Sequence, residues 1–69
     1  MLKEICRFIQ ADDRNSDIMA CYEEYLDGEM DKNTLIEICQ NALGAAKEDY
    51  IMSGQLVGNI ASYYKWLGI

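Results

Sequence analysis

The chain has 69 residues, with twelve Asp or Glu, six Lys or Arg and no His, so its formal net charge is -6. A chain of this length buries only about 60% of the surface that its unfolded form exposes, which leaves room for one small core. Nucleic-acid binding through phosphates needs clustered Lys and Arg, and this balance argues against it. Because 51% of the residues are hydrophobic, the composition also argues against a disordered chain. We expect one folded domain spanning 1–69.

The three cysteines, Cys6, Cys21 and Cys39, are an odd number at wide spacings. Neither a paired disulfide framework nor a Cys-x-x-Cys motif can be built from them, which favours a reducing compartment. Residues 50–64 carry no charge, but polar side chains interrupt them and a bilayer span needs about 20 apolar residues. The sequence therefore predicts a cytoplasmic protein that does not enter a membrane.

The first helix is predicted from an apolar stripe. Leu2, Ile5, Cys6 and Ile9 fall at i, i+3, i+4 and i+7, which is the spacing of one helix face, and charged residues occupy the opposite side. The pattern predicts a helix over about 2–11.

A second helix is predicted over about 16–27. Its apolar stripe runs from Ile18 to Leu26, Ser16 is a candidate N-cap, and Gly28 fits the left-handed position just after a helix end. The polar residues between the two apolar stripes indicate that the helical pattern is interrupted there.

Everything after residue 31 reads as helix, over about 32–43 and 45–67. Gly44 is ambiguous, since glycine can end a helix or lie inside one at a cost of about 1 kcal/mol. Apolar positions continue in steps of three and four from Ile36 to Leu67, so the two segments are either separate or joined in one long kinked helix. The fold class is therefore all-α, a small bundle of three to four helices.

The last predicted helix has apolar residues on two faces, and a helix with two apolar faces needs two partners. The short helices before it can cover only one of them, so we expect a homo-oligomer. A strip with small residues would let a neighbouring helix approach closely. The alternative interpretation is tight packing within one chain. The candidate interface residues are Gly54, Leu56, Val57, Gly58 and Ala61.

Residues 12–31 hold eight acids against Arg14 alone. Such a surface can bind a protein partner, and it can also imitate nucleic-acid phosphates in a basic groove. A solvated helix face would have the same composition. The candidate residues of this acidic face are Asp12, Asp13, Asp17, Glu23, Glu24, Asp27, Glu29 and Asp31.

An aromatic cluster lies near the end of the chain, where Tyr63, Tyr64 and Trp66 surround Lys65. Rings beside a cation can stack on a flat ligand. The stronger interpretation is core packing, because the rings alternate between two faces of the predicted helix.

Catalytic and metal sites are not expected. Without His, the usual activated cysteine cannot be assembled, and the three thiols lie one per predicted helix on apolar stripes, as buried structural thiols do. The sequence therefore predicts no enzyme activity, metal or cofactor.

The expected function is that of a non-catalytic, self-associating module that binds a larger protein and regulates or inhibits it. Two alternatives remain. One is a nucleic-acid mimic that blocks the basic groove of a nuclease or polymerase, and the other is an oligomer that sequesters a small ligand.

Overall fold

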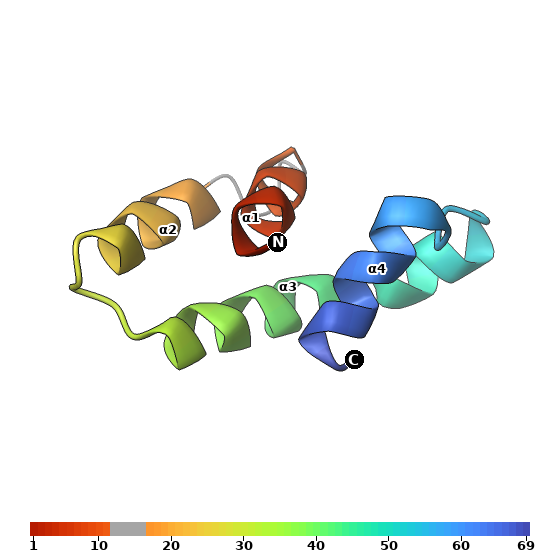
Figure 1. The fold of residues 1–69 in the computed structure, drawn as a ribbon. Coiled ribbons are helices and arrows are strands. Elements are labelled where there is room, and N and C mark those ends of the chain that lie inside the picture. Colours follow the sequence, from red (N-terminus) through yellow and green to blue (C-terminus); the bar gives the residue numbers. More distant parts are fainter. Residues whose placement is uncertain (12–16) are drawn as a thin grey trace.

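The computed structural model describes residues 1–11 and 17–69, and these residues form four helices and no strand (Figure 1). This confirms the predicted all-α bundle. The capping role predicted for Ser16 lies outside the described residues. The helices are α1 (Leu2–Gln10), α2 (Ile18–Leu26), α3 (Lys32–Met52) and α4 (Gly58–Leu67).

The longest helix, α3, is the element against which the others pack. α1 and α2 contact each other and α3, and α4 folds back over the C-terminal half of α3 (Figure 1). The assembly is elongated, with extents of 37 × 23 × 17 Å. Its long dimension is set by α3, whose 21 residues rise by roughly 30 Å at 1.5 Å per residue.

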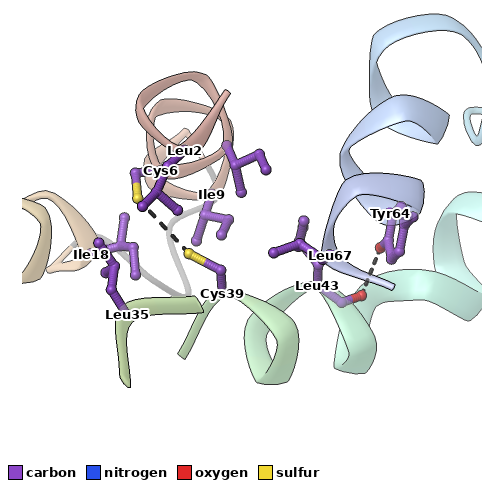
Figure 2. Close-up of a cluster of buried hydrophobic side chains, with 10 residues drawn as sticks. Leu2, Cys6, Ile9, Ile18, Leu35, Cys39, Leu43, Tyr64 and Leu67 are labelled. Carbon is purple, nitrogen blue, oxygen red and sulfur yellow. Dashed lines mark hydrogen bonds between the residues drawn. The ribbon is translucent and has the colours of Figure 1, made fainter. Parts of the chain in front are cut away.

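The core forms where α1 and α2 meet α3. All four residues of the stripe predicted in α1 are buried, and they face buried positions of α3 spaced four residues apart, which lie on one side of a helix. Figure 2 shows how α4 extends this core with Tyr64 and Leu67. The α3 positions are Leu35, Cys39 and Leu43.

The break in the C-terminal half lies at 53–57 and not at Gly44. α3 runs through Gly44 without interruption, because this glycine is on the exposed side of the helix, where a missing side chain removes no core contact. The predicted helix over 45–67 is therefore corrected: its first part belongs to α3, and its last part is the separate helix α4.

Gly54 is the residue that ends α3. Its φ of 72° lies in the left-handed region that glycine adopts without strain. Two bonds characteristic of a glycine-ended helix follow: the Gly54 N–H donates to the Ile51 carbonyl (3.2 Å), and the Gln55 N–H to the Tyr50 carbonyl (2.9 Å). The chain reverses here, and α4 returns along α3.

Hydrogen bonds from side chains fasten α4 to α3. The Tyr64 hydroxyl donates to the Leu43 carbonyl at 2.6 Å inside the core (Figure 2), and the Gln40 side-chain amide donates to the Leu67 carbonyl at 2.7 Å. The last turn of α4 is thus held against the middle of α3.

Aromatic rings complete the junction of α1, α3 and α4. The Phe8 ring centroid is 5.7 Å from that of Tyr50 and 5.4 Å from that of Tyr63, and Tyr50 makes an edge contact with Tyr64 at 6.3 Å. Such tilted and edge-on pairs add to the stability that burial provides.

Candidate interaction surfaces

Three exposed apolar residues, here called the turn cap, lie close together in the chain at the end of α3 and in the following turn: Ile51, Met52 and Val57. Met52 is 82% exposed and Val57 67%. The cause is the early end of α3 at Gly54: the chain turns back before any element can cover the last turn of the helix. Large exposed apolar side chains in one region of a chain are candidates for a surface of association.

A second exposed apolar cluster lines a hollow of about 360 Å³, here called the groove, where α1, α2, α4 and the first residue of α3 meet. Leu26, at the end of α2, is 62% exposed, and the rings of Tyr22 and Tyr25 lie 6.1 Å apart beside it. The lining residues are Met1, Leu2, Lys3, Tyr22, Tyr25, Leu26, Lys32 and Trp66.

The two clusters lie at opposite ends of α3. Lys32, the first residue of that helix, lines the groove, and Met52, the last, belongs to the turn cap. Their separation along the helix is therefore roughly 30 Å. One copy of the chain cannot bring its own turn cap into its own groove.

Charged side chains lie at both ends of α3. Lys3 and Lys32 line the groove, no carboxylate does, and neither lysine has an ion-pair partner among the described residues. At the other end, exposed Glu48 lies in the turn of α3 before the turn cap, and no basic residue occupies the last turn. The helix C-terminus adds partial negative charge of its own.

The small-residue strip predicted as an oligomer interface is not one helix face. Gly54 and Gly58 have φ of 72° and 57°, and they bracket the turn between α3 and α4. Leu56 and Ala61 are half-buried, whereas Val57 is exposed. The premise that a helix could pack along this strip is therefore corrected, because the turn replaces the predicted helix. Contact of these residues with a second copy stays a prediction.

The acidic face lies on α2 and on the loop that follows it. Each of its described members is exposed, and none is in an ion pair with another described residue. Asp12 and Asp13 lie outside the described residues. The exposed members are Asp17, Glu23, Glu24, Asp27, Glu29 and Asp31.

The aromatic residues predicted as a ligand site are not brought together around one described hollow. Tyr64 is buried and lies beside a hollow between α3 and α4 that Lys47 also lines, Tyr63 borders a different hollow, and Trp66 lines the groove. Burial raises the pKa of Tyr64 to about 12, with a smaller contribution from Tyr50. Tyr64 is a core residue whose hydroxyl donates one hydrogen bond, as the packing interpretation predicted.

Two of the three cysteines are in contact. Cys6 on α1 and Cys39 on α3 are both buried, and their sulfur atoms lie 3.8 Å apart (Figure 2). The hydrogen bond with Cys39 lowers the pKa of the Cys6 thiol. The same bond, together with burial, raises the pKa of the Cys39 thiol. Cys21 is partly exposed, and its pKa is raised, chiefly by burial. Spacing along the sequence gave no sign of this pair.

No group of three or more His, Cys, Asp or Glu side chains in the described residues is arranged to hold a metal ion. No helix formed by these residues combines the length and the apolar character that crossing a bilayer requires.

Comparison with known proteins adds no assignment. No protein-family model matches the chain, and neither a curated protein nor a solved structure is significantly similar to it. The function is therefore argued from the two apolar clusters, the acidic face and the thiols alone.

Proposed function

We propose that this protein is a non-catalytic, cytoplasmic interaction module that associates head to tail with further copies of itself. In this arrangement the turn cap of one copy docks in the groove of the next. One observation carries the proposal: of seven large hydrophobic side chains exposed in the described residues, six belong to these two surfaces. They are Ile51, Met52 and Val57 in the turn cap, and Met1, Leu26 and Trp66 in the groove.

Two lysines in the groove offer local charge pairing to a docked turn cap. Lys3 and Lys32 line the groove and can each pair with a carboxylate beside a docked apolar surface, and exposed Glu48 lies next to the turn cap. The acidic face on α2 borders the same groove, so this pairing is local to the two lysines. Charged groups around an apolar contact guide the encounter and fix its orientation more than they add affinity. Apolar burial is expected to provide most of the binding free energy.

The geometry favours a heterologous contact. Because the two surfaces lie roughly 30 Å apart on one chain, each copy offers a free turn cap at one end and a free groove at the other. Contacts of this kind produce rings or open chains of subunits. A two-fold dimer would cover both surfaces only if the two copies lay antiparallel, with each turn cap in the other copy's groove. A larger regulated protein, if it is bound, would compete for the same two surfaces.

A complementation experiment tests the proposal with Met52→Lys, which alters only the turn cap, and Leu26→Glu, which alters only the groove. Both side chains are exposed, so the fold is expected to persist, as circular dichroism will check. Each variant alone is expected to associate at least about 30-fold more weakly than the wild type, because an apolar anchor is replaced by a charge that would lose its water on docking.

An equimolar mixture of the two variants tests whether the copies dock head to tail. The intact turn cap of Leu26→Glu fits the intact groove of Met52→Lys, so an equimolar mixture is expected to form a heterodimer in sedimentation velocity. A Leu26→Glu variant that still self-associates like the wild type would contradict a role for the groove. A mixture that stays monomeric where the wild type associates would contradict head-to-tail docking.

A second candidate function is favoured by the acidic face. Residues 17–31 carry six exposed carboxylates and no Lys or Arg, as expected of an inhibitor that imitates nucleic-acid phosphates. We expect such binding to a cationic nuclease to weaken by at least about 100-fold as salt rises from about 50 to about 300 mM. Glu23→Gln with Glu24→Gln should weaken it further, and Glu48→Gln is the matched control. Absence of binding at low salt would exclude this function.

A further inference from the structure

The contact between the sulfurs of Cys6 and Cys39 is not used by either proposed function. The two residues are 33 positions apart in the sequence, they lie on different helices, and the side chains of both have no exposed surface. Only packing of α1 against α3 brings them together (Figure 2). We propose that Cys6 and Cys39 form an oxidation site at which a hydroperoxide produces a disulfide that joins α1 to α3.

The geometry suits this bond. The sulfur atoms are 3.8 Å apart and already aligned closely enough to share a hydrogen bond. A disulfide bond is ~2.05 Å long, so each sulfur must move by less than about 1 Å. Movements of this size are on the scale that rotation of the two side chains supplies.

The reaction balances with one hydroperoxide. The Cys6 thiolate attacks the outer peroxide oxygen, the O–O bond breaks, and the leaving oxygen takes up a proton as water or an alcohol. Cys6 is then a sulfenic acid. The Cys39 sulfur attacks the Cys6 sulfur, the S–O bond breaks, and hydroxide leaves as water with the Cys39 proton. Two thiols lose two electrons, and the peroxide gains them.

The surroundings of the two thiols favour Cys6 as the attacking sulfur and Cys39 as the sulfur that resolves the sulfenic acid. The hydrogen bond that lowers the pKa of Cys6 favours its thiolate, which is the nucleophile of the first step. Cys39, whose pKa is raised, keeps its proton and resolves the sulfenic acid. Cys21 on α2 is more accessible than either, but its raised pKa makes it a poor nucleophile.

Access requires local opening, because neither buried sulfur touches solvent. α1 has nine residues and packs through one face, so a partial opening beside Cys6, with its hydrogen bond to Cys39 still in place, is the opening that admits a peroxide. Once the bond has formed, α1 cannot leave α3. Closing a loop of this length is expected to reduce the unfolding equilibrium constant by several hundred-fold, about 10²–10³.

The test uses hydrogen peroxide on the whole chain, at a concentration where the protein is monomeric, followed by trypsin and mass spectrometry. Cleavage at Arg7, Arg14 and Lys32 places the three cysteines on separate peptides, so the mass of two linked peptides shows which cysteines are joined. We expect one linked product, Cys6 with Cys39, and a fall from three free thiols to one. The oxidised chain should resist urea until dithiothreitol restores the reduced form.

Matched variants separate this site from general thiol oxidation. Cys21→Ala should give the same linked peptides, whereas Cys39→Ala should give none and should lose the gain in stability. The wild type oxidised in guanidinium should lose its preference for the pair, because folding creates the contact. Linkage through Cys21, disulfides only between chains, or oxidation of Cys21 with Cys6 and Cys39 still reduced would each overturn the proposal. Every one of these readouts is independent of self-association.

Discussion

Leu35→Ala is expected to lower the free energy of unfolding by roughly 3 kcal/mol, within the 2–5 kcal/mol typical of a buried leucine. Leu35 is 0% exposed and lies where α1 and α2 meet α3, so its loss leaves a cavity that three helices border. A domain of this size rarely has more than about 3–5 kcal/mol of stability from its core. A large fraction of the variant should therefore be unfolded without denaturant.

Leu26→Ala is the matched control, because the same atoms are removed from a side chain that is 62% exposed. Its effect on the free energy of unfolding should stay within about 0.5 kcal/mol. Urea denaturation of both variants at low protein concentration, followed by circular dichroism, measures the difference. Equal losses at the two positions would contradict the core described above.

Tyr64→Ala should cost about 3–5 kcal/mol, because a buried aromatic ring and its contacts with α3 are removed. Tyr64→Phe isolates the hydroxyl. It retains the ring and should cost only about 1 kcal/mol at neutral pH, the usual net value of one hydrogen bond. The Leu43 carbonyl belongs to the backbone of α3, which Tyr64→Phe leaves intact, so the stability lost is limited to the hydrogen bond from the hydroxyl.

The difference between the pKa of Tyr64 in the folded and the unfolded chain also makes the free energy of unfolding depend on pH. An unfolded tyrosine ionises near pH 10, whereas the pKa of Tyr64 in the folded chain is raised to about 12. As pH rises from 10 to about 12, the unfolded chain releases this proton first, so the free energy of unfolding falls. Tyr64→Phe lacks this dependence. Its deficit relative to the wild type should shrink above pH 10, and an unchanged deficit at pH 11.5 would contradict the burial of this hydroxyl.

The helices that the sequence predicted well are those whose pattern reflects a single packing partner. The stripe of Leu2, Ile5, Cys6 and Ile9 has one buried face, and all four residues are buried in α1. Gly28 follows the end of α2 with φ of 81°, as its position predicted. Local pattern and tertiary packing agree in both cases, so periodicity was sufficient.

The turn at 53–57 could not be predicted from periodicity, because apolar positions continue in steps of three and four across it. Residues on both sides of the turn pack against the same core, so apolar positions recur although the helix does not. The informative signal was the pair Gly54 and Gly58, which reads equally well as a small-residue helix strip. Glycine fits both a tight helix contact and a left-handed turn, and only the folded chain separates the two.

The groove and the thiol pair were missed for a different reason. The groove joins residues from all four helices, and the contact of Cys6 with Cys39 joins residues 33 positions apart. Neither arrangement has a characteristic spacing. The expectation of uncovered apolar surface in the C-terminal half was based on two apolar faces of one helix, and the turn at 53–57 replaces that helix. Met52 and Val57 are exposed in the folded chain for a different reason, namely their position at this turn.

The central claim, self-association through the turn cap, is tested most directly by the average mass of the wild type in sedimentation equilibrium, from about 1 µM to about 1 mM. We predict that the mass of the wild type rises with concentration above that of one chain, while that of Met52→Lys stays at one chain throughout. A wild type that remains a single chain up to the highest concentration would contradict the claim.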